Sequence, residues 1–296
     1  MTCARAWAPR TAHSESLGGA AGYGDRVLTR KIPRTGEELP AIGLGTWQTF
    51  DVEPRGHAPL QEVLTKFFAA GARLIDSSPM YGRAEETTGD LLAKVGGAPF
   101  LATKVWTSGK QAGIDQMKRS MQRMRTTRMD LMQVHNLLDY KTHLPVLREW
   151  KAAGTIRYLG VTHYQHGAFD AIEKLMREEQ LDFIQIPYSI TDTLAEERLL
   201  PTAIETGTAV IVMTPFESGA LFRHVRGKQL PQWAAEAGIA SWAQFFLKWI
   251  LGHAAVTCPI PATSNPAHLA DVMQAGTGAL PDVKLRGKMR QVLEAS

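Results

Sequence analysis

Two kinds of segment alternate along this sequence from residue 41 onward. Short apolar stretches rich in β-branched residues are followed by longer stretches in which apolar residues recur at helical spacing. The stretches with strand character are residues 41–47, 73–78, 100–106, 130–136, 156–162, 183–189, 209–215 and 256–263. The stretches with helical character are residues 59–71, 84–96, 114–125, 144–154, 168–180, 194–207, 241–251 and 265–276.

Eight strand–helix units in this order predict a parallel sheet with helices outside it. Eight parallel strands also close a barrel that side chains just fill, so we expect an α/β fold of the (β/α)8 TIM-barrel class. An open doubly wound sheet is the alternative, but no G-x-G-x-x-G motif follows the first strand. A β-hairpin is expected over residues 26–42 and an extra C-terminal helix over residues 281–296. Residues 26–296 are thus assigned to one barrel domain.

Residues 1–25 are expected to form a disordered or extended N-terminal tail. Arg5 and Arg10 lie in this tail, but no apolar stretch follows them, so it does not have the pattern of a signal peptide. Two interpretations stay open: a native extension, or the remnant of an export signal. Cys3 of the tail and Cys258 in a strand are not expected to form a disulfide, and a reducing, cytoplasmic location fits best.

The composition argues against two classes of partner. The net charge of +4 is mild, and the basic residues of positions 118–128 are interleaved with Met and Gln, which is typical of a solvated helix face rather than a nucleic-acid site. No apolar run reaches the length of roughly 18 residues that a membrane span needs. We therefore expect no nucleic-acid and no membrane partner.

Ionisable side chains gather where three successive strands are expected to end. Asp76 ends the second strand, and Tyr81 lies in the loop that follows. Lys104 and His135 lie near the ends of the third and fourth strands. Because the active site of such a barrel is built at the C-terminal ends of its strands, these four residues are the candidate catalytic group.

The four side chains suit proton transfer to a carbonyl oxygen. A Tyr is protonated at neutral pH, and a neighbouring ammonium such as Lys104 makes the phenol a better acid. A lysine near a barrel mouth needs a counter-charge, which Asp76 can supply. His135 can hydrogen-bond a carbonyl oxygen and hold it near Tyr81. The set contains no nucleophile, so a reduction would take its hydride from a cofactor.

The sequence resembles the aldo-keto reductase family. The segments that carry the resemblance are "GLGTW", "LIDSSPMYG", "ATKVW", "DLMQVHN", "GTIRYLGVTHY", "FIQIPYS", "VIVMTPF" and "PIPATSNPAHL", in order from about residue 27 to 276. The resemblance implies NADP(H)-dependent reduction of aldehydes or ketones to alcohols. It also implies a catalytic tetrad of Asp76, Tyr81, Lys104 and His135. No metal site is expected, because no third ligand lies near His163 and His166, whose spacing is seen in metal sites.

The resemblance also implies cofactor contacts. Where the family usually has a Ser-Asn pair for the carboxamide, this chain has Thr162 and His163, and the usual stacking aromatic is replaced by Met213. Gln185 matches the usual glutamine. The implied cofactor-binding residues are Thr46, Trp47, Asp76, Thr162, His163, Gln185, Met213, Thr214, Pro215, Phe216, Ser218, Ala220, Leu221, Pro261, Ala262, Thr263, Ser264, His268 and Asp271.

The expected choice between NADP(H) and NAD(H) depends on the segment after the eighth strand. The family often grips the 2′-phosphate there with basic residues, but Ala262 and His268 occupy those positions. Thr263 and Ser264 keep hydroxyls, and a helix that begins at Pro266 would attract phosphate. We expect NADPH to be preferred by a reduced margin, which weakens as rising pH removes the charge of His268. NAD(H) is the alternative cofactor.

The substrate is expected to be a small-molecule carbonyl compound. Trp47, Trp106, Tyr81 and His135 are the expected substrate contacts, with Tyr188 as a further candidate. The physiological substrate and the reaction direction stay open, and the chain is expected to be a monomer or a weak homodimer. Two other functions stay open: a cofactor-binding regulatory subunit, and a different barrel enzyme such as a metal-dependent hydrolase or an isomerase.

Overall fold

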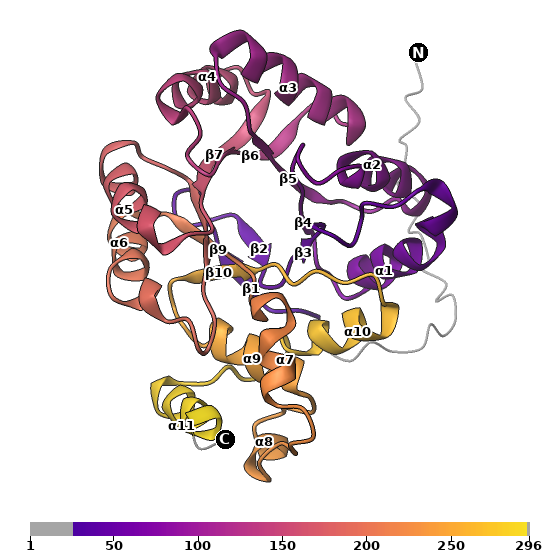
Figure 1. Cartoon of the computed structure of the whole chain (residues 1–296), viewed down its shortest axis with the longest axis vertical. Helices are drawn as coiled ribbons and strands as arrows, with labels where there is room; N and C mark the ends of the chain where they lie inside the picture. Colours follow the sequence, from indigo (N-terminus) through magenta and orange to yellow (C-terminus); the bar gives the residue numbers. More distant parts are fainter. Residues whose placement is uncertain (1–25, 295–296) are drawn as a thin grey trace, which may run out of the picture.

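Eight parallel strands follow one another around a barrel in sequence order (Figure 1). The structure, a computed structural model, describes residues 26–294, so the tail predicted for residues 1–25 lies outside it. The strands are β3 (Leu44–Gly45), β4 (Leu74–Asp76), β5 (Phe100–Val105), β6 (Met129–His135), β7 (Ile156–Thr162), β8 (Phe183–Pro187), β9 (Ala209–Met213) and β10 (Val256–Pro259). The predicted (β/α)8 barrel is confirmed, and the open doubly wound sheet is wrong.

The first and last strands close the barrel through backbone contacts. The Gly43 and Gly45 N–H groups donate to the carbonyls of Pro259 and Pro261 at 3.0 Å each, and Gly45 pairs with Ala262 in a parallel bridge. A Cβ at Gly45 would lie 2.9 Å from the carbonyl oxygen of Ile260. The closure therefore needs a residue without a side chain at this position.

Helices alternate with the strands and surround the barrel (Figure 1). The outer helices are α1 (His57–Ala69), α2 (Ala84–Val95), α3 (Lys110–Arg123), α4 (Tyr140–Ala152), α5 (Phe169–Glu178), α6 (Leu199–Thr206), α9 (Trp242–Leu251) and α10 (Pro266–Gln274). The extra C-terminal helix is present as α11 (Val283–Glu294). No helix within residues 26–294 has the length and apolar character needed to cross a membrane.

The connection between β9 and α9 contains two short helices that were not predicted from the sequence. They are α7 (Ala220–His224) and α8 (Trp233–Glu236). Each has five residues or fewer, so neither is long enough to show a helical period in the sequence. Gly219, which has a positive φ of 86°, precedes α7, and Val225 caps its C-terminal end.

The two-residue period of the strands divides the barrel interior into layers. On β5, Phe100 and Ala102 belong to the apolar interior, and Leu101 and Val105 pack on the outer helices. Continuing the period from Phe100 and Ala102 places Lys104 inside as well. Strands thus supply apolar side chains at their beginnings and polar ones at their C-terminal ends. The interior is filled by apolar side chains at one end and contains polar side chains such as Lys104 at the other.

The N-terminal hairpin closes the apolar end of the barrel. Strands β1 (Thr29–Lys31) and β2 (Glu38–Pro40) pair antiparallel, and Ile32 and Leu39 pack fully buried in the same interior cluster as Leu74 and Phe100. Both Leu74 and Phe100 begin their strands, so the hairpin covers the end opposite the polar residues. The predicted hairpin is confirmed.

An ion-pair network holds the hairpin in place. The guanidinium of Arg157 on β7 binds Glu37 of the hairpin and donates to Asp130 on β6 at 2.8 Å. The Tyr158 hydroxyl donates to the same Glu37 carboxylate at 2.6 Å. These side chains are less than a third exposed, so the pairs are screened less than ordinary surface pairs.

We expect Arg157→Met to lower the free energy of unfolding by about 1–3 kcal/mol, because Glu37 and Asp130 would keep their charges without a partner. The control is Arg290→Met, which removes an exposed pair with Glu294 on α11 and should change stability by about 0.5 kcal/mol or less. Urea unfolding of the three proteins measures both values. An equal loss of stability in the two variants would contradict the conclusion that Arg157 holds the hairpin in place.

Candidate active site

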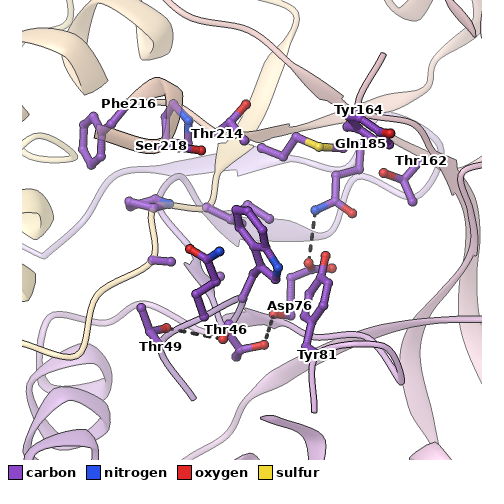
Figure 2. A pocket seen from close by; sticks show the side chains of 18 of the residues that line it. Thr46, Thr49, Asp76, Tyr81, Thr162, Tyr164, Gln185, Thr214, Phe216 and Ser218 are labelled. Carbon is purple, nitrogen blue, oxygen red and sulfur yellow. Dashed lines mark hydrogen bonds between the residues drawn. The ribbon is translucent and has the colours of Figure 1, made fainter. Parts of the chain in front are cut away.

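A cavity of about 800 Å³ opens at the C-terminal ends of the strands (Figure 2). The predicted site residues that line it are Thr46, Trp47, Asp76, Tyr81, Lys104, Trp106, His135, Thr162, Gln185, Met213, Thr214, Pro215, Phe216, Ser218, Pro261 and Ala262. They come from all eight barrel strands or the loops that follow them. All four candidate catalytic residues therefore face one pocket.

A buried ion pair lies at the base of the cavity. The Lys104 ammonium donates to an Asp76 carboxylate oxygen at 2.6 Å and to the Ser77 carbonyl at 2.7 Å. The side chains are only 1% and 3% exposed. Burial lowers the pKa of Lys104, but the charges and hydrogen bonds of Asp76 and Tyr81 outweigh it and leave that pKa above its ordinary value. The lysine is held as an ammonium in a dry site.

Two glutamine amides complete the surroundings of Asp76. Gln185 on β8 donates to the same Asp76 oxygen as Lys104, at 3.1 Å (Figure 2), and Gln133 on β6 donates to the other oxygen at 3.3 Å. Gln133 also donates to the Gln185 carbonyl oxygen at 3.2 Å. A buried carboxylate needs such partners, because the cost of removing it from water is otherwise not offset.

Tyr81 lies against the ammonium. Lys104 Nζ is 5.2 Å from the centre of the Tyr81 ring. Burial raises the pKa of Tyr81, and the charge and hydrogen bond of Lys104 lower it. Lys104 acts in the direction expected from the sequence, but burial is the larger effect, so the net pKa is above its ordinary value rather than below it. The phenol therefore carries its proton throughout the neutral pH range.

A tight turn sets the place of Tyr81. Its backbone N–H donates to the Ser78 carbonyl at 3.0 Å, and its own carbonyl accepts the Ala84 N–H that begins α2. Gly82 between them has a φ of 58°, and a Cβ there would meet the Asp51 carboxylate at 2.3 Å. The same Asp51 side chain accepts the Arg83 N–H at 2.9 Å. The loop is thus fixed on both sides of the phenol.

His135 faces Tyr81 across the cavity. The two rings lie 6.0 Å apart between centres and meet edge to face. The His135 Nδ1 atom lies 3.0 Å from the Ser78 hydroxyl. Burial, with smaller contributions from the charges of Lys104 and His163, lowers the pKa of His135 to about 3. The imidazole is therefore neutral at physiological pH.

Of the two residues expected to bind the carboxamide, only Thr162 lines the cavity. Its buried hydroxyl has no hydrogen-bond partner within the described chain. His163 does not line it: the ring accepts the Gln165 N–H through Nδ1 at 3.0 Å and stacks on Tyr164. Tyr164 is instead the residue of this loop that borders the cavity (Figure 2).

Several other predicted residues lie outside the lining of the cavity: Ala220, Leu221, Thr263, Ser264, His268 and Asp271. Asp271 accepts hydrogen bonds from the Ser241 hydroxyl and the Gln244 amide, one on each oxygen. The predicted helix start after Asn265 is present, since the Asn265 side chain accepts the Ala267 N–H at 2.8 Å and Pro266 opens α10.

Tyr188, a further candidate for substrate contact, does not line the cavity. It is fully buried against Trp249, with ring centres 5.2 Å apart, and its hydroxyl donates to Glu196 at 2.5 Å. Arg286 of α11 donates to both Tyr188 and Glu196. The residue therefore anchors the C-terminal helix. The local sequence around Tyr188, the end of an apolar strand, could not predict a contact with Arg286, which lies 98 positions away.

Some residues of the site were not predicted from the sequence. Gln133 lies two residues before His135 on β6, and that spacing places both on one face, so it could have been found. Ser78, Met80 and Tyr164 lie in loops, where side-chain direction has no period. Among the described residues, no three His, Cys, Asp or Glu side chains gather as they would around a metal ion.

Comparison with known proteins places this architecture in a family. The model of the Aldo/keto reductase family matches residues 41–286. Aldo-keto reductase YhdN of Bacillus subtilis (strain 168) is 29% identical over 191 residues, which are 58% of this chain and 57% of that protein. The NADH-specific methylglyoxal reductase of Escherichia coli (strain K12) is 27% identical over 228 residues, which are 65% of this chain and 69% of that protein.

A solved structure shares the fold. The aldo/keto reductase from Klebsiella pneumoniae in complex with NADP and acetate superposes with a TM-score of 0.76 over 91% of this chain and 95% of that one, at 22% identity.

We expect the low pKa of His135 to make folding stability fall in mild acid. The unfolded histidine has a pKa near 6.5, and the folded one about 3, so below pH 6.5 only the unfolded state takes up this proton. The free energy of unfolding should then drop by up to about 1.4 kcal/mol per pH unit between these values. In His135→Asn this component is missing. Urea unfolding of both proteins from pH 7 to 5 measures it, and parallel curves would contradict the assignment.

Proposed function

The chain belongs to the aldo/keto reductase family, and from that premise we propose that it reduces aldehydes or ketones to alcohols with NADP(H) as the hydride donor. The observation that carries the proposal is the meeting of Tyr81, the buried Lys104–Asp76 pair and His135 in one cavity. A proton donor, a fixed positive charge and a neutral imidazole around one space suit a carbonyl group that gains a proton on its oxygen.

Tyr81 is proposed as the general acid. Its raised pKa keeps the phenol protonated until negative charge develops on the substrate oxygen. The proton then passes from the hydroxyl to that oxygen, and the nearby Lys104 ammonium stabilises the phenolate left behind. Asp76 keeps Lys104 in place and charged. The pair is formed before substrate arrives, so no reorganisation is needed during the reaction.

His135 is proposed to orient the carbonyl group. The neutral imidazole can donate one hydrogen bond to the substrate oxygen without competing with Tyr81 for the transferred proton. Its ring lies edge to face with that of Tyr81, so both groups can reach one oxygen atom. Holding this atom between two donors contributes orientation as well as charge stabilisation.

The residues present fit a nicotinamide cofactor. The unpartnered Thr162 hydroxyl and the remaining lone pair on the Gln185 carbonyl oxygen can bind a carboxamide. Met213 offers an apolar surface for the ring, and Thr214, Phe216 and Ser218 border the same cavity (Figure 2). When bound, NADP(H) supplies the hydride. The NADP complex of the Klebsiella pneumoniae structure supports this assignment.

The cavity walls favour uncharged substrates. Trp47, Met80 and Trp106 border the cavity with side chains 40–46% exposed, so they offer apolar surface to a ligand. The charged residues of the lining are Asp76 and Lys104, which neutralise each other. An aldehyde or ketone with an apolar body fits this arrangement better than a phosphorylated or carboxylated compound.

We expect Tyr81→Phe to abolish nearly all carbonyl reduction, with a loss of about 10²-fold or more in kcat, because the ring stays and the proton donor is lost. NADPH binding should change little. Steady NADPH oxidation with benzaldehyde and the fluorescence of bound NADPH measure the two quantities. Most of the rate remaining in the variant would assign the proton to another group, and a single slow turnover in the wild type would favour a cofactor-binding regulatory subunit.

The proposed 2′-phosphate site lacks strong cations. Ala262 is exposed at the cavity edge, and Thr263, Ser264 and the start of α10 follow it. His268 is the basic residue of this segment and is exposed on α10. We propose NADP(H) with a reduced preference over NAD(H). The Escherichia coli relative is an NADH-specific methylglyoxal reductase and the Klebsiella pneumoniae structure is an NADP complex, so proteins similar to this chain use either cofactor.

We expect Ala262→Arg to tighten NADPH binding by roughly tenfold and to leave NADH binding unchanged, because only NADPH carries the 2′-phosphate that the new guanidinium can pair with. Ala254→Arg, which adds the same charge before β10 at the opposite end of the barrel, should change neither constant. Dissociation constants from fluorescence titration test this. Equal gains for both cofactors would place the 2′-phosphate elsewhere.

A further inference from the structure

Ser78 joins the two sides of the cavity. Its carbonyl accepts the backbone N–H of Tyr81 at 3.0 Å, and its hydroxyl lies 3.0 Å from Nδ1 of His135. Ser78 is fully buried, in the loop between β4 and α2. One residue thus touches both the backbone of the proposed proton donor and the ring of the residue proposed to orient the substrate.

A neutral imidazole has one protonated and one unprotonated nitrogen, so the hydrogen bond between Ser78 and His135 has two possible directions. Either the serine hydroxyl donates to Nδ1 and Nε2 carries the proton, or Nδ1 donates to the serine oxygen and Nε2 is bare. Within residues 26–294, Nε2 has no hydrogen-bond partner, and the ring borders the cavity. The direction of this hydrogen bond therefore decides whether Nε2 offers a ligand a donor or an acceptor.

The surroundings of Ser78 favour the direction in which the serine hydroxyl donates to His135 Nδ1. The serine oxygen already lies 3.5 Å from the donating N–H of Met80, so it has a weak donor of its own. Its proton has no other acceptor among the described residues than His135 Nδ1. If Nδ1 donated instead, a buried hydroxyl proton would be left without an acceptor, which is costly in a dry site.

We propose that Ser78 is a positioning residue that fixes His135 in the tautomer with the proton on Nε2, so that His135 offers a hydrogen-bond donor to the cavity. The opposite tautomer would present a lone pair to the carbonyl oxygen and repel it. This role rests on the proposed function, because it concerns how that site binds a carbonyl group. The tautomer itself is a property of the folded chain and can be measured without any turnover.

Nitrogen-15 NMR of the histidine-labelled full chain reads the tautomer directly. We expect His135 to show a pyrrole-type Nε2 and a pyridine-type Nδ1 near pH 7. His143 is an internal reference, because its Nε2 lies 2.7 Å from the Thr107 carbonyl, which can only accept, and must therefore carry a proton. A pyrrole-type Nδ1 at His135 would overturn the proposal whatever the activity of the enzyme.

The variant Ser78→Ala tests the role. We expect both tautomers of His135 to be populated, kcat with benzaldehyde to fall about three- to tenfold, and the NADPH dissociation constant to stay the same. Ser78→Thr, which keeps the hydroxyl, should restore the single tautomer and most of the rate. Ser120→Ala on α3, also a buried serine, should change neither quantity. A single unchanged tautomer and an unchanged kcat in Ser78→Ala would overturn the proposal.

The two proposals fail in different ways. If the wild-type chain reduces no carbonyl compound but shows the expected tautomer shift in Ser78→Ala, the proposed function fails and the structural role of Ser78 stands. If the chain is an active reductase and the tautomer is the same in both proteins, the role of Ser78 fails and the proposed function stands.

Discussion

The ion pair between Asp76 and Lys104 is the constraint on which the site depends. Two opposite charges lie in the barrel interior, almost without contact with water. Such a pair is tolerated only if its hydrogen bonds are satisfied, and the Ser77 carbonyl and the amides of Gln133 and Gln185 do this. Four strands thus contribute to one charge cluster. This cluster forms the base of the cavity, and the ring of Tyr81 lies 5.2 Å from its ammonium.

The same barrel separates stability from chemistry along its axis. At one end, apolar side chains and the hairpin with Ile32 and Leu39 exclude water, and Arg157 closes the edge. At the other end, inward positions are polar and open to the cavity. This arrangement lets the site keep unpartnered groups, such as the Thr162 hydroxyl, without weakening the packed end.

The walls of the cavity are held by side chains from the outer helices. Gln116 of α3 accepts the Trp106 N–H at 2.6 Å and donates to the Trp106 carbonyl at 3.1 Å. The next loop is joined to this one, because Asp139 accepts the Gly109 N–H at 2.7 Å. The backbone of Trp106 is therefore held in place before a ligand binds, which reduces the entropy lost on binding.

The sequence by itself determined the barrel and most of the cavity base. Alternating segments fix the number and direction of the strands, and the two-residue period carries Asp76, Lys104 and His135 to one interior face. Only the tertiary structure decided what the loops do. Ser78 reaches His135 over 57 positions, the His163 ring turns to the Gln165 backbone, and Tyr188 binds Arg286 of α11. Burial also reversed the net direction expected for the pKa of Tyr81. Local patterns report the face of a strand, but loop direction and burial depend on contacts between distant segments, which no local pattern contains.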